Sequence, residues 1–266
     1  MVKTLALKPI AFLLLQNIAA LAWIVQRSTI SHMTGASTNK INLSIIVPVL
    51  NERHYINSFV AHLEAQWQEP RELIFVDGGS TDGTWEWLQK QQLTSYRSPQ
   101  GRAVQSNTGA HHANGNLYYF VHVDSKLPYH FDHALLQAHY NGATAGCFQL
   151  EFDSKHWLLQ WAAAGSRCNH LLCRGGDQSL FITKKRFETL KGFNHHYKVC
   201  EDLELIKRLY QQGSFKVLPQ KIRTSSRRFH QNGILRLLIH FGVLHLTHWC
   251  GAGPQFLYRY YRWAVR

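Results

Sequence analysis

DGGSTDGT at residues 77–84 directly follows the apolar run LIFV at residues 73–76. This order is typical of a buried strand that ends in a glycine-rich turn and then opens a helix. In an α/β sheet, ligands bind at the carboxyl ends of the strands, where loop backbone and helix N-termini face the crevice. We therefore expect Asp77 either to contact a ligand or only to cap the turn, where Asp and Gly are common for conformational reasons.

Two other apolar runs end in polar residues in the same way. Residues 41–49 precede an Asn-Glu pair, and residues 117–123 precede Asp124. Helix-like stretches at 55–67 and 101–114 separate the runs. Runs this apolar are typical of parallel strands buried on both faces. The sequence therefore predicts an α/β fold with a mostly parallel sheet, whose strands deliver polar groups to one rim.

Five segments in order resemble the signature of family 2 glycosyltransferases with the GT-A fold, namely VPVLNE at 47–52, VDGGSTDGT at 76–84, SPQGR at 98–102, HVD at 122–124 and CEDLEL at 200–205. Within that family the chain looks closest to the small bacterial enzymes known as radical-SAM/selenodomain-associated transferases. The resemblance runs from about residue 41 to the C-terminus and implies a Rossmann-like central sheet with flanking helices. Two positions depart from it, because many relatives have a second Asp in place of Gly78 and an Asp in place of His122.

The resemblance implies roles on the side of a nucleotide-sugar donor. Asp77 is expected to accept hydrogen bonds from a base or ribose, and Glu52 either assists it or caps the helix that begins near His54. Asp124 resembles the last acid of a D-x-D motif, which holds Mg²⁺ or Mn²⁺ between the two phosphates. His122 stands at the first acid of that motif, where it would face ribose or favour Mn²⁺, unless it has no role.

Three arginines are candidates for contacts with the diphosphate, because guanidinium groups match phosphate oxygens. Arg102 lies in a Gly-Arg helix start, and Arg227 and Arg228 precede Phe229. The Arg228-Phe229 step resembles the Arg-Trp step of related processive enzymes. The alternative for each arginine is simple solvation at the surface.

Acids in the second half of the chain are candidates for catalysis. Asp177 and Gln178 precede an apolar run and are expected to line the sugar or acceptor site, although Asp177 alternatively only closes a turn. Glu201 and Asp202 open a helix, whose positive end is expected to lower their pKa values. By resemblance, Asp202 is the general base of an inverting displacement and Glu201 orients it; the alternative is a pair of acids that only stabilises the helix end.

Charge divides the chain into three parts. Residues 41–204 carry 14 Lys/Arg and 16 Asp/Glu, whereas residues 205–266 carry 11 Lys/Arg and residues 1–40 carry four, with no acid in either part. We expect a catalytic domain at 41–220 and a basic amphipathic helical tail at 221–266. This tail either contacts an anionic membrane surface or packs on the core with its arginines solvated. No nucleic-acid motif accompanies it, so we expect no nucleic-acid partner.

The N-terminal 40 residues combine an apolar segment with a polar linker. Residues 9–25 are short for a membrane span, so they form a weak anchor, an interfacial helix, or an upstream region if Met33 is the true start. We expect no cleaved signal peptide. Five cysteines without a C-x-x-C pair indicate a reducing compartment. The expected location is the cytoplasm, at the cytoplasmic face of the inner membrane.

These patterns together predict a metal-dependent, inverting glycosyltransferase that moves a sugar from a nucleotide sugar to an acceptor hydroxyl, one that is lipid-linked or part of the cell envelope. A nucleotidyltransferase is the first alternative, but the chain lacks an early basic loop for a triphosphate. A non-catalytic nucleotide-sugar binding protein is the second, and Asp202 separates it from an enzyme because a binding protein needs no base. A dinucleotide oxidoreductase is disfavoured because no G-x-G-x-x-G opens the first helix.

Overall fold

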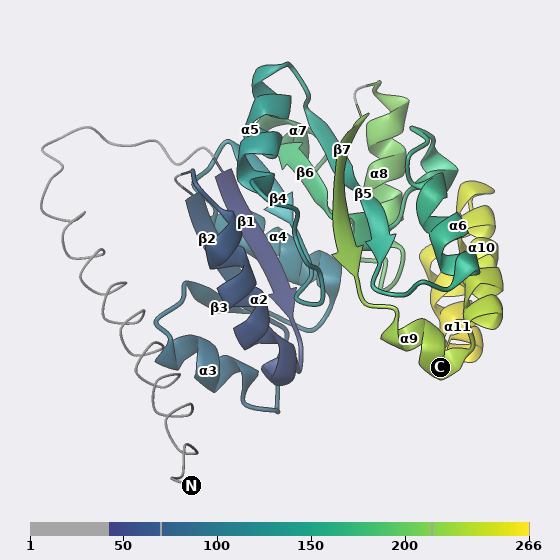
Figure 1. Cartoon of the computed structure of the whole chain (residues 1–266), viewed down its shortest axis with the longest axis horizontal. Helices are drawn as coiled ribbons and strands as arrows, with labels where there is room; N and C mark the ends of the chain where they lie inside the picture. The colour runs from purple at the N-terminus through teal and green to yellow at the C-terminus, as the bar shows by residue number, and fades with distance from the viewer. Residues whose placement is uncertain (1–42, 70, 214, 266) are drawn as a thin grey trace, which may run out of the picture. The chain divides into compact units, whose positions relative to one another are not determined.

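The computed structural model describes residues 43–69, 71–213 and 215–265. Within this part, seven strands form one mixed sheet in the order β3-β2-β1-β4-β6-β5-β7 (Figure 1). The strands are β1 (Leu43–Val49), β2 (Arg71–Asp77), β3 (Ser95–Arg97), β4 (Leu117–Phe120), β5 (Ala145–Phe152), β6 (Leu180–Thr183) and β7 (Phe215–Thr224). The first four strands are mutually parallel, β6 is antiparallel to β4 and β5, and β7 is parallel to β5. The predicted α/β fold with a mostly parallel sheet is confirmed.

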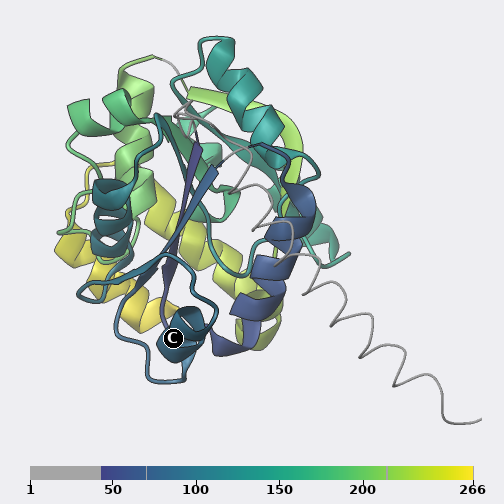
Figure 2. The same cartoon turned by 90° about the vertical axis from the view of Figure 1, so that its left-hand side faces the viewer.

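Helices cover both faces of this sheet. They are α2 (Arg53–Gln66), α3 (Thr84–Lys90), α4 (Arg102–His112), α5 (Phe131–Tyr140), α6 (Trp157–Gly165), α7 (Lys184–Thr189), α8 (Glu201–Gln211), α9 (Arg227–Asn232), α10 (Ile234–Trp249) and α11 (Pro254–Ala264), with short 3₁₀ turns η1 (Leu171–Cys173) and η2 (Gly176–Gln178). The view in Figure 2 shows α2 and α5 on one side of the sheet and α4 and α8 on the other. This layering explains the uninterrupted burial of β1.

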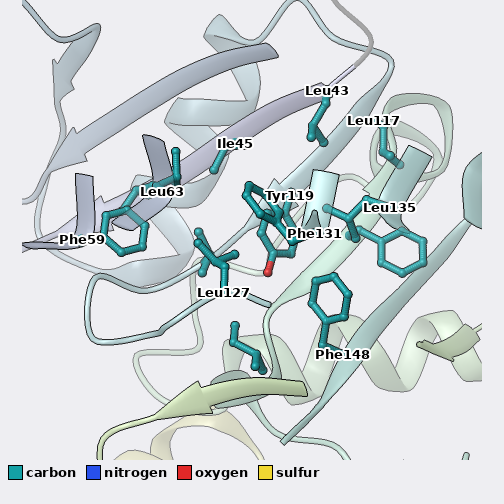
Figure 3. Packing of buried hydrophobic residues seen from close by; sticks show 14 of the residues in the cluster. Leu43, Ile45, Phe59, Leu63, Leu117, Tyr119, Leu127, Phe131, Leu135 and Phe148 are labelled. Atoms are coloured by element: carbon teal, nitrogen blue, oxygen red, sulfur yellow. The ribbon is translucent and has the colours of Figure 1, made fainter. Parts of the chain in front are cut away.

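Two apolar clusters, one on each face, hold these layers together. On one face, Ile45 of β1 packs in a cluster with Phe59 of α2 and Phe131 of α5 (Figure 3). On the other, Ile46 shares a cluster with Leu205 of α8. The side chains of neighbouring residues of β1 therefore point to opposite faces of the sheet. Burial of each Leu, Ile or Phe side chain contributes about 1.5–3 kcal/mol to the stability of the fold. The position of the rim loops thus depends on a core that is buried on both sides.

The strand predicted at 117–123 is shorter than expected. β4 ends at Phe120, although the Val121 amide still donates to the Ile46 carbonyl at 3.2 Å. The Ser125 amide then donates to the His122 carbonyl, which closes a turn. Because the chain leaves the sheet here, His122 and Asp124 lie in a loop at the rim instead of within the strand.

The C-terminal helices pack on the rest of the domain through a third cluster, in which Phe152 and Leu159 meet Phe229, Leu237 and Leu257. The sequence left two interpretations of the tail open, and packing on the core is one of them. The predicted boundary between residues 220 and 221 falls inside β7. No helix in the described ranges is long and apolar enough to cross a membrane. The interpretations of residues 9–25 and 28–40 and of Met33 lie outside the described residues.

Candidate active site

The order of the strands in the sheet reverses between β1 and β4, which makes this position a topological switch point. From β1 the chain adds β2 and β3 on one side, whereas β4 lies on the other side. Ligands of open α/β sheets bind at such a switch point, outside the carboxyl ends of the strands. Glu52 follows β1, and His122 and Asp124 follow β4. The structure therefore brings the predicted residues of these two loops to the expected rim.

Asp77 holds the glycine-rich turn. Its carboxylate accepts hydrogen bonds from the backbone amides of Gly79 and Ser80 at 3.1 Å, and Arg97 Nε lies 4.0 Å away. The side chain is 0% exposed. The turn role that the sequence left open is thus realised, whereas contact with a base or ribose stays a prediction.

Hydrogen bonds also join this turn to the loop after β1. The Thr81 amide donates to Asn51 Oδ1 at 2.8 Å, and the Arg53 amide donates to Asp82 Oδ2 at 2.9 Å. Burial acts to raise the pKa of Asp82, but hydrogen bonds from Thr84 and from the Arg53 amide hold that pKa below its usual value. The carboxylates of this region are therefore satisfied by the protein itself.

Gln105 explains the glycine at the first departure from the family pattern. Its amide nitrogen donates to the carbonyls of Val49 and Val76, both at 2.8 Å, which ties the ends of β1 and β2 together. A Cβ at Gly78 would lie 3.0 Å from the Gln105 carboxamide. A side chain at position 78 would therefore require the Gln105 side chain to shift. The sequence motifs do not identify Gln105, because it lies one turn inside a helix.

Glu52 occupies the N-cap position of α2, but its side chain makes no capping hydrogen bond. Capping, one of its two predicted roles, is therefore not realised. Burial and the nearby charge of Asp124 raise the pKa of Glu52, while Arg102 and Arg227 lower it. The charge of Glu52 is therefore coupled to that of Asp124, which follows β4.

Asp124 and Asp177 approach each other across the rim. Burial and the charge of Asp177 raise the pKa of Asp124, and burial also raises the pKa of Asp177. Both residues nevertheless keep exposed surface, so a ligand can reach them from solvent. Burial and Arg102 lower the pKa of His122 to about 3, which leaves its imidazole neutral.

Asp202 and Glu201 form the first turn of α8, as the sequence predicts. Burial raises the pKa of Asp202, and Arg102 and two backbone amides only partly lower it. Burial and Asp202 also raise the pKa of Glu201. The expectation that the helix end lowers these pKa values is therefore wrong, because loss of water outweighs the helix end.

Gly176 of η2 makes room for the Asp202 carboxylate. A Cβ at this position would lie 1.7 Å from Asp202 Oδ2, whereas a Cβ at Gly175 would meet nothing within 4 Å. Asp202 therefore rests directly against the backbone of η2. Both Gly176 and Asp202 line a small cavity of about 30 Å³, together with Arg102, His122 and Glu201.

Arg102 is the cation shared by these acids. Burial acts to lower its pKa, but the charges of Glu201, Asp202 and Asp177 outweigh burial and raise it. We call Glu52, Asp124, Asp177, Glu201 and Asp202 the carboxylate cluster. None of the direct ion pairs in the described ranges involves this cluster or Arg102. Arg102 and the acids are therefore available to a ligand.

Gln178 and Asp177 face different surroundings although they are neighbours. Gln178 is buried, its amide nitrogen donates to the Cys173 carbonyl at 2.8 Å, and its oxygen accepts from Cys147 Sγ. In this structure it supports the loop, so a direct contact of Gln178 with substrate stays a prediction. Asp177 is the member of the pair that is open to the rim.

The C-terminal part of the chain completes one side of the site. Arg227 lies over the Tyr55 ring at 4.7 Å, and Arg228 donates to the Tyr261 hydroxyl. Asp153 Oδ1 accepts from the Ser226 amide at 2.7 Å, directly before these arginines. The sequence motifs do not identify Tyr261 or Asp153. The spacing of Leu257, Tyr261 and Ala264 on one face of a helix was the available signal for Tyr261.

Comparison with known proteins agrees with this geometry. Residues 44–197 match the sequence model of glycosyl transferase family 2, which is more than half of the chain. The chain therefore belongs to this family. The resemblance to the radical-SAM-associated subgroup stays a prediction. No match was found among curated protein sequences.

Two solved structures have a similar fold. TarS from S. aureus, residues 1–349, is 18% identical with a TM-score of 0.57, and the match covers 77% of this chain and 66% of that one. The chain thus spans slightly less than two thirds of this relative. The mannosyltransferase PcManGT from Pyrobaculum calidifontis is 17% identical with a TM-score of 0.60, and the match covers 96% of this chain and 82% of that one.

Proposed function

We propose that this family member is a glycosyltransferase that moves a sugar from a nucleotide-sugar donor to an acceptor hydroxyl, with inversion and with a divalent metal. The observation that carries the proposal is the carboxylate cluster around Arg102 at the switch point of the sheet, whose charges form no direct ion pair with any residue that the structure describes. Ionisable groups with perturbed pKa values in such a cleft are typical of active sites. Crystal structures of TarS contain UDP or UDP-GlcNAc, and that of PcManGT contains GDP-Man and Mn²⁺, which supports a nucleotide sugar as donor.

The donor diphosphate is assigned to Arg102 and to the arginine pair of α9. Arg102 stands in the first turn of α4, so its guanidinium and the helix N-terminus both favour an anion. Arg228 contributes positive charge beside Asp177, and Arg227 contributes it beside Glu52. As the nucleotide departs, these cations stabilise the charge that develops on its diphosphate.

The acids of the rim fit a hard divalent cation, but only as part of its ligand set. Burial, and after it like charges, raise the pKa values of Asp124 and Glu52, so a cation there would relieve the repulsion between the acids. The described residues contain no group of three or more His, Cys, Asp or Glu side chains that could hold a metal. We assign Asp124, with neutral His122 beside it, as the protein ligands, and phosphate oxygens as the rest. A bound Mg²⁺ or Mn²⁺ would neutralise charge on the diphosphate.

Asp202 is assigned as the general base. Its raised pKa makes the ionised carboxylate a stronger base than an exposed aspartate, while Arg102 favours the ionised form. Asp202 takes the proton of the acceptor hydroxyl as that oxygen attacks the anomeric carbon. Glu201 positions Asp202, and Asp177 contacts the sugar or the acceptor. Inversion follows if this single displacement has no covalent intermediate.

The location is part of the same proposal. A nucleotide-sugar donor and five free cysteines support the cytoplasm. The excess of basic residues at 205–266 supports contact with the anionic cytoplasmic face of a membrane.

A thermal-shift screen tests the donor class. UDP, GDP, UDP-GlcNAc and GDP-mannose are each added to the full chain with Mn²⁺, with Mg²⁺, or with a chelator. A ligand at about 100 times its dissociation constant stabilises the folded state by roughly 2.7 kcal/mol. We expect a rise in melting temperature for at least one nucleotide, and a smaller rise with chelator. If none of these nucleotides shifts the melting temperature with either metal, the proposal is wrong.

A further inference from the structure

The outward face of α10 is apolar along the whole helix. Leu235, Ile239, Leu246 and Trp249 recur at spacings that place them on one face, and between 51% and 59% of each residue is exposed. Gly242 occupies the remaining position of this face and is also exposed. The opposite face of α10 is the buried one, through Leu237 and Leu244. An exposed helix face this apolar is unusual in a soluble domain and indicates an interaction surface.

Helix α11 packs against α10 and also has exposed aromatic residues on one face. Phe256 and Trp263 are 52% and 74% exposed and are two helical turns apart. The Trp263 ring lies 6.1 Å from the ring of His240, and the Tyr260 hydroxyl meets His240 Nδ1 at 2.8 Å. Trp263 therefore lies beside α10 at His240. We call Leu235, Ile239, Leu246, Trp249, Phe256 and Trp263 the apolar strip.

Positive charge accompanies the apolar strip. Arg236, Arg259 and Arg262 are exposed on the same two helices. Residues 205–266 contain no Asp or Glu that would repel an anionic surface. Helix α6 packs against α10 (Figure 1). It adds two exposed tryptophans, Trp157 and Trp161. Trp with Arg around an aliphatic strip matches the boundary between headgroups and acyl chains of an anionic bilayer.

We propose that the apolar strip docks the enzyme on an anionic lipid bilayer, with α10 and α11 lying in the plane of the interface. This proposal deepens and rests on the proposed location at the membrane by naming the residues that contact lipid. The same helix α11 carries Tyr261 on another face, where its hydroxyl accepts a hydrogen bond from Arg228. The lipid-facing helix and the proposed diphosphate site are therefore in direct contact.

Vesicle flotation of the full chain tests this proposal without donor or acceptor, so its outcome is independent of the transferase reaction. The vesicles are phosphatidylcholine with or without phosphatidylglycerol, each in a salt series. Ile239→Ser with Leu246→Ser should weaken binding to the anionic vesicles about tenfold or more. Arg259→Gln and Arg262→Gln should each weaken it about fivefold, and only at low salt.

Matched controls are Tyr129→Ser and Tyr140→Ser, because these tyrosines are 75% and 73% exposed outside the apolar strip. They should bind vesicles like the wild type. Equal binding by Ile239→Ser/Leu246→Ser and the wild type would overturn the proposal. So would a dimer, seen by light scattering without lipid, that this double variant abolishes while vesicle binding is unchanged, because the apolar strip would then face a second copy of the chain.

Discussion

Aspartates occur both in the glycine-rich loop after β2 and in the carboxylate cluster. The two regions differ in how the protein compensates the charge of these carboxylates. Asp77 accepts a hydrogen bond from the Gly79 amide, and Asp82 accepts from the amides of Thr84 and Arg53. Asp124, Asp177 and Asp202 have raised pKa values and no direct ion pair with a described residue. The carboxylates of the first region are satisfied by hydrogen bonds, whereas in the second region the ionised acids are disfavoured although Arg102 lies near them. Such unfavourable sites persist where function requires them.

The substitution Asp202→Asn should have the largest effect, and this effect should be on the rate of catalysis. The amide keeps the shape of the carboxylate but cannot take the acceptor's proton, so the single-turnover rate should fall about 100- to 10,000-fold with unchanged donor affinity. Glu204→Gln is the control, because Glu204 is on the same helix but pairs with Arg208. A variant that keeps more than roughly a third of the wild-type rate would make Asp202 structural.

Gly176→Ala should have the next largest effect. Its Cβ would overlap Asp202 Oδ2, and a displacement of about 1 Å at a reacting group costs up to about 100-fold in rate. Gly175→Ala, whose Cβ meets no atom within 4 Å, should retain full activity. The rate and the circular dichroism spectrum of both variants give the measurement. Equal rates for the two would show that Asp202 tolerates displacement.

The pH profile should shift with Arg102→Gln. The ionised form of Asp202 is the active one, so kcat/KM should fall as pH drops through its raised pKa. Because Arg102 lowers that pKa, its removal should move the acid limb to higher pH, whatever the variant loses in donor binding. Arg167→Gln, at an exposed position away from the cluster, should leave the limb in place. An unmoved limb in Arg102→Gln would assign the titration to another group.

The smallest expected effect on turnover belongs to Asp77→Asn. Loss of charge weakens the hydrogen bonds from Gly79 and Ser80, so stability should fall by about 1–3 kcal/mol in urea unfolding. Donor affinity should weaken about tenfold or less through the loop, with kcat unchanged. A loss of kcat comparable to that of Asp202→Asn would contradict the assignment of Asp77 to a structural role.

The sequence predicted the sheet, the rim and the place of most candidate residues, because β-branched runs and polar strand ends are local patterns. It did not predict the pKa direction at Asp202, since burial is set by elements that meet only in the folded chain. Gln105 was missed for the same reason, as its partners belong to two distant strands. Tyr261 reaches Arg228 across 33 positions, which no local motif records.

Metal dependence of nucleotide binding tests the central claim most directly, namely that the carboxylate cluster is the donor site. Calorimetry with a nucleoside diphosphate compares the wild type, Asp124→Asn, and Glu188→Gln as an exposed control on α7, each with Mn²⁺ and with a chelator. We predict that chelator weakens binding to the wild type and to Glu188→Gln, and that Asp124→Asn loses most of this difference. Equal affinity of the wild type with Mn²⁺ and with chelator would contradict the account.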